Sequence, residues 1–322
     1  MSTAADVIAG NARWSAECSD AVEFLDGLPD DSIDLLFCSP PYELARTYGI
    51  GEKMVGGQAW VDWMVRVFRA AAPKVKGLIA MNCEGQTRGY RYSAVPFLLM
   101  ADLHRAGFNL RKPVVFHRVG IPGSGGPDWL RNDWEPVICV TREGRLPWSD
   151  NTACGHAPKY GPGGVLSHRV TDGTRVKQNR IKELVGAGMS QREAARNVGL
   201  PTMTATSGTN DGGTVNLRAY VPPDIANPGN ILKLDIGGGK MGHAAAHDNE
   251  APFPLELPEF FIKSFCPPGG IVCDPFGGSG TTMHTAVVNG RRGVSCDIRQ
   301  SQIELVGRRM KTVTPDMFAE VE

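Results

Sequence analysis

A glycine-rich segment near the C-terminus has the residue types that bind a nucleoside or a nucleotide. The apolar run Ile271-Val272-Cys273-Asp274 ends in an acid, and a turn with three glycines follows it. Glycines allow a sharp turn and the close approach of a ligand to the backbone, and the first N–H groups of a following helix have no partner within that helix. The segment predicts a strand, a ligand-binding turn and a helix from Thr281 to Asn289.

A second acid follows this unit at a spacing that suits a ribose. Gly293 to Asp297 predict the next strand, and Asp297 ends it. The acid lies about twenty residues beyond the loop, the spacing at which a carboxylate reaches the ribose hydroxyls in doubly wound sheets. We therefore expect Asp274 and Asp297 to flank one cofactor pocket.

The residues of the loop leave four interpretations open. A P-loop has a Lys directly after its last glycine, whereas Thr281 follows Gly280 here. A nicotinamide-dinucleotide fingerprint has a third glycine where Met283 stands. S-adenosylmethionine carries no pyrophosphate and needs neither feature. A plain connecting turn would bind nothing.

A second polar motif lies in the first quarter of the chain. Asp31 to Cys38 predict a short buried strand, and Ser39-Pro40-Pro41-Tyr42 comes at its C-terminal end. Open α/β sheets bind ligands at the carboxyl ends of their strands. The two prolines fix φ and hold the flanking groups in place. A hydroxyl, a carbonyl and an aromatic ring are therefore presented together.

The elements that position these motifs form an alternating series. This pattern predicts an α/β fold with a doubly wound, mostly parallel sheet covered on both faces. Residues 1–15 carry little pattern, and we expect them to be loosely held. Helices are predicted over 19–28, 59–71 and 95–106, and strands over 77–83, 113–117 and 134–140.

The two motifs together resemble the S-adenosylmethionine-dependent DNA amino methyltransferases of the permuted beta class. In that class the catalytic tetrapeptide comes first, the target recognition region second and the cofactor loop last. The resemblance covers residues 16–141 and 228–310. It implies a Rossmann-like methyltransferase fold, S-adenosyl-L-methionine as cofactor and double-stranded DNA as substrate. It also implies a catalytic half (1–145), a target recognition insert (146–228) and a cofactor-binding half (229–322).

The resemblance assigns roles to individual residues. The Ser39 hydroxyl and the Pro40 carbonyl would accept hydrogen bonds from the amino group of a flipped-out base, and Tyr42 would stack on that base. Asp20 has two interpretations, as an acid at a helix N-terminus or as the acceptor for the adenine amino group of the cofactor. The expected cofactor-binding residues are Asp20, Phe253, Pro254, Asp274, Pro275, Phe276, Gly278, Ser279, Gly280, Thr281, Thr282 and Asp297.

The first residue of the tetrapeptide bears on which base is methylated. C5-cytosine methylation needs a Cys nucleophile in a Pro-Cys pair, and the chain has no such pair. Ser39 resembles mainly the cytosine-N4 enzymes, whereas Asp at that position resembles the adenine-N6 enzymes. A neutral acceptor serves either amine, so adenine-N6 stays open. A helix-turn-helix regulator without catalysis and a nicotinamide-dependent oxidoreductase are the alternatives from other classes.

Two further regions carry candidate contacts to DNA. His117 and Trp129 lie on and after a strand end and either hold the flipped base or have ordinary structural roles. Residues 179–200 resemble a helix-turn-helix, with Ser190 as N-cap and Glu193 three residues later. Residues 156–200 contain eight basic and three acidic side chains. A solvated helical hairpin is the alternative to DNA binding by Lys177, Arg180, Lys182, Gln191, Arg192 and Arg196.

The composition sets limits on the remaining properties. Lys and Arg number 34, as do Asp and Glu, so any basic surface has to be local. The eight cysteines occur without metal-binding spacing, and neither a leader nor a long apolar run is present. We expect a cytoplasmic protein without metal or membrane contact. A monomer or a homodimer, a cognate restriction endonuclease, the recognition sequence and a bacterial or viral origin all stay open.

Overall fold

The computed structural model describes most of the chain and divides it into two compact units. The described residues are 2–43, 55–120, 126, 128–142, 144–159, 183–190, 193, 194, 197, 223–236 and 253–313, with the backbone of 167–169 and 175–177. The first unit comprises Met1–Cys154 and Asn227–Glu322, and the second comprises Gly155–Ala226.

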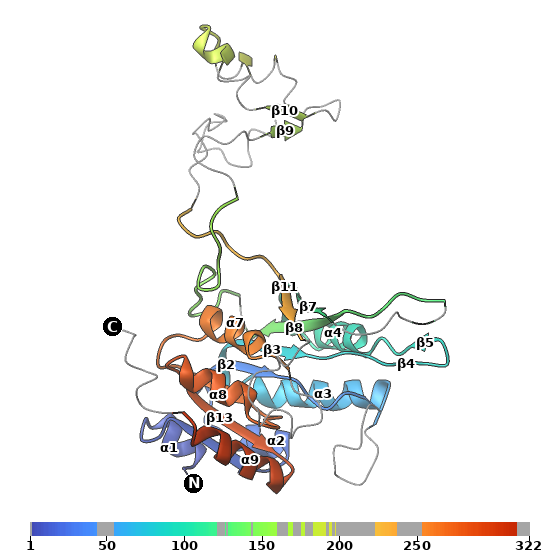
Figure 1. The fold of residues 1–322 in the computed structure, drawn as a ribbon, viewed down its shortest axis with the longest axis vertical. Helices are drawn as coiled ribbons and strands as arrows, with labels where there is room; N and C mark the ends of the chain where they lie inside the picture. Colours follow the sequence, from blue (N-terminus) through green and yellow to red (C-terminus); the bar gives the residue numbers. More distant parts are fainter. Residues whose placement is uncertain are drawn as a thin grey trace. The chain divides into compact units, whose positions relative to one another are not determined.

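A mixed sheet organises the first unit (Figure 1), and nine strands belong to it within the described residues. The four strands at one side and β3 beside them run parallel, whereas β8 is antiparallel to both β3 and β7. The predicted mostly parallel α/β sheet is confirmed, with β8 as an antiparallel member. In sheet order the strands are β1 (Trp14–Cys18), β13 (Arg292–Asp297), β12 (Ile271–Asp274), β2 (Ile33–Cys38), β3 (Val75–Asn82), β8 (Trp134–Thr141), β7 (Val114–Val119) and β11 (Ile231–Asp235), with β6 (Asn109–Leu110) beside β8.

Helices cover both faces of the sheet because its strands are apolar on both sides. Along β2, Leu36 and Cys38 belong to one apolar cluster, whereas Leu35 and Phe37 belong to another. This alternation follows from the two-residue period of a strand. The first cluster includes residues of α1 (Ala4–Ile8), α2 (Ala21–Gly27), α3 (Gln58–Ala71) and α4 (Val95–Arg105). The second includes residues of α7 (Glu256–Phe265) and α8 (Thr281–Val288), and α9 (Gln300–Met310) packs in a third cluster with α8 and β1.

The N-terminal residues are ordered, so the expectation that residues 1–15 are loosely held is wrong. Thr3 caps α1 in a capping box with Asp6. The strand β1 then pairs with β13, and Arg292 donates from Nη1 to the Val7 carbonyl over 2.7 Å. Both elements are five residues long. Contacts to a strand far along the chain therefore stabilise them, and no local periodicity predicts them.

The second unit contains the expected helical cap. Residues 183–186 are helical and a turn follows, with Gly188 at φ 95°. The Ser190 Oγ accepts from the Glu193 N–H over 3.2 Å, and the Ser190 N–H donates to the Glu193 carboxylate over 3.1 Å, as the sequence predicts. Lys177 lies in β10 (Arg175–Lys177), which pairs with β9 (Ser167–Arg169). The predicted DNA-contacting residues Arg180, Lys182, Gln191, Arg192 and Arg196 lie outside the described residues.

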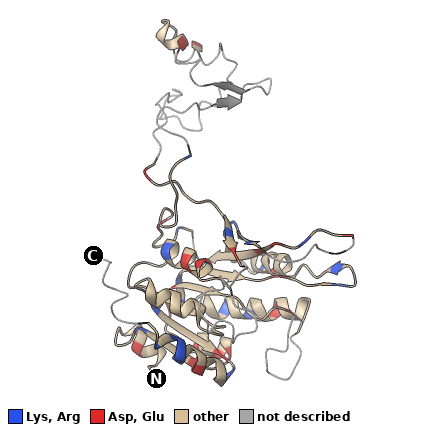
Figure 2. Ribbon diagram, viewed as in Figure 1, with Lys and Arg blue, Asp and Glu red and all other residues tan. Residues whose placement is uncertain are grey.

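Two properties of the described residues concern membrane and metal binding. No helix among them combines the length and the apolar character that crossing a bilayer requires. In the same part of the chain, no group of His, Cys, Asp or Glu side chains is arranged to hold a metal ion. Figure 2 shows acidic and basic residues interspersed over the first unit.

Candidate active site

The order of four neighbouring strands brings the two sequence motifs to one edge of the sheet. The strands β1, β13, β12 and β2 are adjacent and parallel, so their carboxyl ends point the same way. Asp297 ends β13, Asp274 ends β12, and Asp20 and Ser39 closely follow β1 and β2. The Ser39–Tyr42 tetrapeptide and the glycine loop therefore lie at the same edge of the sheet, although more than two hundred residues, from Tyr42 to Asp274, separate them along the chain.

The glycine loop folds back over the end of β13. Gly278 and Gly280 have φ values of 49° and 76°, in the left-handed region that favours glycine. The Gly277 N–H donates to the Cys296 carbonyl over 2.7 Å, and a Cβ at Gly277 would lie 3.2 Å from that oxygen. The Gly278 N–H donates to the Asp297 Oδ2 over 3.1 Å. The loop conformation thus depends on glycines and on Asp297.

Three carboxyl groups surround the loop, each in a different environment. The Asp20 Oδ1 accepts from the Val22 N–H over 2.8 Å, which confirms the helix-terminal interpretation of Asp20. The Asp297 Oδ1 accepts from the backbone N–H and from Nε of Arg299 over 2.9 and 3.1 Å. Burial raises the pKa of Asp274 to about 7; the charge of Asp297 adds to this, and the neighbouring Thr282 hydroxyl and the hydrogen bond from the Phe276 N–H oppose it. Asp274 therefore gains and loses its proton near neutral pH.

A buried arginine supports the loop from behind. The Arg309 side chain is fully buried and donates from Nη1 to the Ser279 carbonyl over 3.2 Å and to the Thr281 Oγ1 over 3.0 Å. Burial lowers its pKa to about 10. The sequence analysis missed this residue, whose only signal is its place on the apolar stripe of α9 beside Val306 and Met310.

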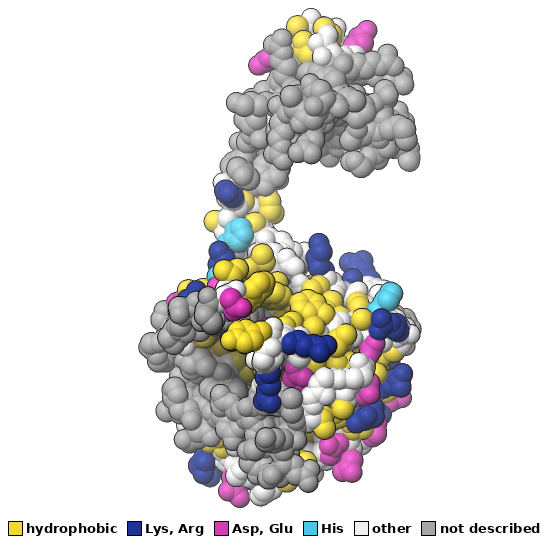
Figure 3. All heavy atoms as spheres, turned by 90° about the vertical axis from the view of Figure 1, so that its right-hand side faces the viewer, with side chains coloured by type: hydrophobic (Ala, Val, Ile, Leu, Met, Phe, Trp, Pro, Cys, Tyr) yellow, Lys and Arg dark blue, Asp and Glu magenta, His cyan; other side chains and the backbone are white. Residues whose placement is uncertain are grey.

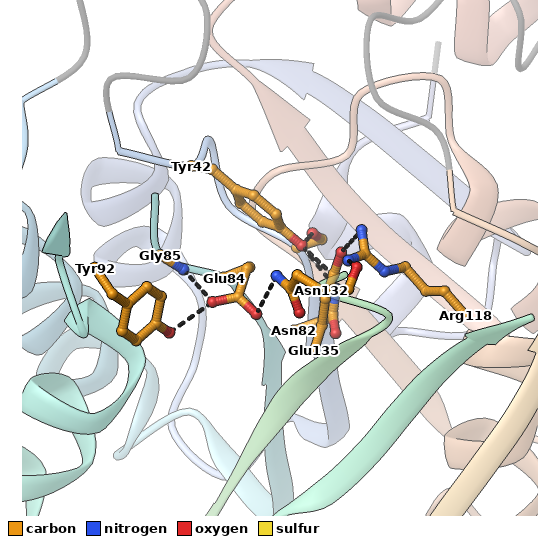
Figure 4. Close-up of polar contacts among 9 residues, drawn as sticks. Tyr42, Asn82, Glu84, Gly85, Tyr92, Arg118, Asn132 and Glu135 are labelled. Atoms are coloured by element: carbon orange, nitrogen blue, oxygen red, sulfur yellow. Dashed lines mark hydrogen bonds and ion pairs between the residues drawn. The ribbon is translucent and has the colours of Figure 1, made fainter. Parts of the chain in front are cut away.

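The tetrapeptide is held by a hydrogen-bond network that begins at Ser39, and Figure 4 shows its members Tyr42, Asn82 and Glu135. The Ser39 Oγ donates to the Tyr42 hydroxyl over 3.4 Å, and that hydroxyl donates to the Glu135 Oε2 over 2.7 Å. The Asn82 Nδ2 donates to the Tyr42 hydroxyl over 2.8 Å and to the Glu135 Oε2 over 2.7 Å. Trp60 donates to the Pro41 carbonyl over 2.9 Å. The motif is therefore fixed from several elements at once.

Glu135 is the negative centre of this network. Its side chain is buried, and Arg118 Nη1 lies 2.9 Å from Oε1. Burial, and next the charge of Glu135, raise the pKa of Tyr42 well above its usual value, so the phenol keeps its proton. The sequence analysis missed Asn82, Arg118 and Glu135. A charged residue within the apolar run 134–140 is the signal that could have identified Glu135, because buried carboxylates need partners.

The other predicted residues lie around these groups. Pro40, next to Ser39, is buried. Pro275 and Phe276 follow Asp274, and the ring centroids of Phe276 and Trp63 lie 5.8 Å apart. Phe253 packs edge-on against Phe37 at 5.9 Å. Pro254 is buried at the start of α7, and Thr282 is buried at the start of α8. His117 lies 3.6 Å from the Asp133 carboxylate, and Trp129 is 78% exposed.

This fold places a glycine-rich loop and a Ser-Pro-Pro-Tyr motif at one edge of a Rossmann-like sheet. The family model described as DNA methylase, of the N6 and N4 type, matches residues 33–308. The chain therefore belongs to the N6/N4 DNA methylase family, and it is an S-adenosyl-L-methionine-dependent DNA methyltransferase.

Relatives in the family act on both bases. The chain is 23% identical to the type II methyltransferase M.PvuII of Proteus hauseri, over 91% of this chain and 82% of that protein. It is 22% identical to the DNA adenine methyltransferase YhdJ of Escherichia coli K12, over 94% of this chain and 84% of that protein. Both matches extend over most of the chain, so overall similarity does not select the base.

Solved structures share the fold. The PvuII DNA methyltransferase, cytosine-N4-specific, superposes with a TM-score of 0.59 at 18% identity, over 95% of this chain and 89% of that chain. A putative DNA modification methylase of Thermus thermophilus, complexed with S-adenosyl-L-methionine, gives 0.53 at 19% identity, over 93% of this chain and 94% of that chain. The likeness extends along nearly the whole of both chains.

The donor set around the loop fits this cofactor. S-adenosylmethionine carries a sulfonium and an ammonium group, which the carboxyl groups of Asp20, Asp274 and Asp297 favour electrostatically. Among the described residues, Arg299 is bound to Asp297 and Arg309 donates to the loop backbone from behind. A pyrophosphate would meet these acids unfavourably, which argues against a dinucleotide.

Proposed function

We propose that the protein methylates the N4 amine of cytosine in double-stranded DNA at a specific sequence. Ser39 at the first position of the tetrapeptide supports this choice of base, as does the likeness to the cytosine-N4-specific PvuII enzyme. The match to the adenine methyltransferase YhdJ supports adenine-N6 as the second candidate. The observation that carries the catalytic proposal is the chain of hydrogen bonds from Ser39 through Tyr42 to Glu135.

The direction of these hydrogen bonds suits acceptance of an amine. An exocyclic amine is a poor nucleophile because its lone pair is delocalised into the ring. The Ser39 proton is directed to Tyr42, so the lone pairs of Oγ are left to accept from the substrate amine. Together with the Pro40 carbonyl, Ser39 would favour a pyramidal nitrogen and stabilise the positive charge that develops on it. The cofactor supplies an electrophilic methyl group.

The carboxylate of Glu135 strengthens this acceptor at a distance. Hydrogen bonds in series polarise one another, and the charge of Glu135 makes the Tyr42 oxygen a better acceptor for the Ser39 proton. The Ser39 oxygen thereby becomes more negative. Glu135 is thus a positioning residue that gives a neutral serine part of the effect of a carboxylate. The Tyr42 ring would stack on the flipped base while its hydroxyl stays bound.

The cofactor would lie along the neighbouring strand ends. Asp297 would accept from the ribose hydroxyls, and Asp20 from the adenine amino group through the oxygen that does not cap α2. The Gly278 to Thr282 segment would face the methionine part, with Asp274, Pro275 and Phe276 beside it. Phe253 and Pro254 would contribute apolar contact from the start of α7.

The insert 146–228 would recognise the target sequence. The helical residues 183–186, the cap between Ser190 and Glu193, and the basic residues from Lys177 to Arg196 in the sequence support this assignment. Helix N-termini and basic side chains contact phosphates in protein–DNA complexes.

The modified base identifies the activity directly. Purified protein is incubated with S-adenosylmethionine and mixed-sequence duplex DNA, and the digested nucleosides are analysed by mass spectrometry. We expect N4-methylcytosine from the wild type and from the control Ser2→Ala, an exposed serine outside both motifs and the insert, and none from Ser39→Ala. N6-methyladenine would overturn the choice of base, and product from Ser39→Ala at the wild-type rate would overturn the role of Ser39.

A further inference from the structure

A short hairpin beside the active site has an aromatic residue in its two-residue turn. The backbone conformation at that position favours a Gly or Asn residue. The hairpin consists of β4 (Thr87–Arg88) and β5 (Arg91–Tyr92). Gly89 and Tyr90 form its turn, with φ values of 54° and 63°. Such turns favour Asn or Gly, because a positive φ strains other side chains. The Tyr90 side chain is nevertheless 83% exposed, so no packing contact offsets that strain.

The base of the hairpin is fixed to the strand that supports the catalytic network. The Glu84 Oε1 accepts from the Tyr92 hydroxyl and from the Gly85 N–H, each over 2.6 Å (Figure 4). Glu84 follows β3 by two residues, and Asn82 at the end of β3 donates to Tyr42. A Cβ at Gly85 would lie 2.9 Å from the Tyr92 ring. The hairpin therefore projects, firmly anchored, from the sheet edge that holds Ser39.

An exposed aromatic row continues from the hairpin. The ring centroids of Tyr92 and Phe97 lie 6.4 Å apart, and those of Phe97 and Trp134 lie 6.5 Å apart. These three side chains are 39%, 48% and 39% exposed, and Trp129 is 78% exposed. Figure 3 shows hydrophobic side chains gathered on this face, with both basic and acidic side chains among them. Exposed apolar patches of this kind mark interaction sites.

The charges on this surface identify the partner. Arg88 and Arg91 flank the turn, and residues 85–100 contain no acid. Arginines between exposed aromatic rings suit a ligand with both phosphates and flat bases, because the guanidinium contacts phosphate and the ring stacks on a base. The neighbouring site takes its substrate from DNA. Duplex DNA around the target base is therefore the occupant that this surface fits.

We propose that the 87–92 hairpin is a DNA-contacting wedge of the catalytic unit. The Tyr90 ring enters the base stack next to the flipped nucleotide, and Arg88 and Arg91 contact the flanking phosphates. Side chains inserted between bases unstack them and lower the cost of extruding one. The inference rests on the proposed function, because it requires a base that leaves the duplex.

The charge of the hairpin is tested by binding, without any need for turnover. The double variant Arg88→Ala/Arg91→Ala should weaken binding to mixed-sequence duplex, measured by fluorescence anisotropy. The slope of log K against log salt should fall by about 1.8, the value for two lost phosphate contacts. The control Arg66→Ala/Arg69→Ala removes two exposed arginines of α3 and should leave the slope unchanged. Equal slopes for the wild type and the hairpin variant would overturn the arginine contacts.

The wedge itself is tested at Tyr90. Tyr90→Gly removes the ring and suits the positive φ, so the variant should fold at least as well as the wild type. On the duplex that the wild type methylates, we expect kcat/KM for DNA to fall about tenfold, from the loss of one stacked ring. Tyr90→Trp should retain activity. A mismatch at the target base should restore the kcat/KM of the Tyr90→Gly variant, because an unpaired base is easier to extrude.

Three outcomes separate this inference from the proposed function. Methylation by the wild type with unchanged kcat/KM in Tyr90→Gly would overturn the wedge and leave the proposed function standing. A loss of activity in Tyr90→Gly that the mismatch does not restore would also overturn it. No methylation by the wild type would overturn the proposed function, while the salt titration would still report whether the hairpin binds DNA.

Discussion

Replacing Glu135 with Gln removes one negative charge from the hydrogen-bond network of Ser39, Tyr42 and Glu135 and keeps the size and shape of the side chain. In the native network Glu135 accepts from Tyr42 over 2.7 Å and pairs with Arg118 over 2.9 Å. A hydrogen bond to a charged group contributes about 1.5 to 3 kcal/mol and a neutral one about 0.5 to 1.5 kcal/mol. The bond from Tyr42 should therefore weaken by roughly 1 to 1.5 kcal/mol. If that loss is felt in the transition state, kcat should fall about 5- to 13-fold.

We expect kcat to fall, with little change in the KM for S-adenosylmethionine or in the KM for DNA. Glu135→Gln leaves the cofactor loop and the DNA-contacting surfaces intact, so binding should persist. Single-turnover transfer of labelled methyl groups from S-adenosylmethionine measures the step directly. Tyr42→Phe interrupts the same chain of hydrogen bonds, so its effect should not add to that of Glu135→Gln in a double-mutant cycle.

A matched control and two outcomes make this reasoning refutable. Glu259→Gln breaks an i,i+4 pair with Lys263 on the surface of α7, and it should leave the single-turnover rate unchanged. A wild-type kcat in the Glu135→Gln variant would show that the charge of Glu135 does not polarise the Ser39 hydroxyl. Fully additive effects of Tyr42→Phe and Glu135→Gln would show that the two residues act separately.

Three further predictions concern the cofactor side of the site. Asp297→Ala should raise the Kd for S-adenosylmethionine about 10- to 100-fold by calorimetry, the loss of a charge-assisted hydrogen bond; an unchanged Kd would limit Asp297 to holding Gly278 and Arg299. The folded protein protonates Asp274 at a pKa of about 7, above the usual 3.8, so it binds more protons than the unfolded chain between those values. Stability in denaturant should therefore fall as pH rises from about 4 to about 7, and Asp274→Asn should flatten that slope, whereas equal slopes would contradict the raised pKa. Arg309→Met should raise the Kd for the cofactor about fivefold, because the loop loses a hydrogen bond of about 1 kcal/mol. The Tm should not fall, because Nε and Nη2 of Arg309 lack partners in the described part of the chain. A marked fall in Tm would assign Arg309 to stability.

The locally encoded parts of the site were predictable from the sequence. Three glycines after Asp274 predict the loop, and the structure places Gly278 and Gly280 at positive φ. The helix predicted from Thr281 to Asn289 forms as α8, ending at Val288 with Asn289 as its cap. Asp20 at the start of a helix predicts the N-cap that forms. Each of these features depends on neighbours within a few positions, which a single sequence displays.

The parts that depend on strand pairing were not predictable. Glu135 reaches Tyr42 because β8 pairs with β3 in a register that sets Asn82 opposite Val137. Nothing local to Ser39 indicates an acid 96 residues further along the chain. The antiparallel direction of β8 likewise follows from tertiary pairing, since β8 has the same apolar composition as its parallel neighbours.

The strand order also governs when the enzyme can first work during its own synthesis. The gap between β1 and β2 in the sheet is filled by β12 and β13, which follow the other described strands of this sheet along the chain. A nascent chain that stops before Ile271 has two unpaired strand edges where the methyl donor should bind, and such edges invite mispairing. Ser39 is already translated at that point, but the strands that hold the proposed cofactor loop are not. Methylation therefore begins only after translation of β13, and neither half of the chain expressed alone should modify DNA.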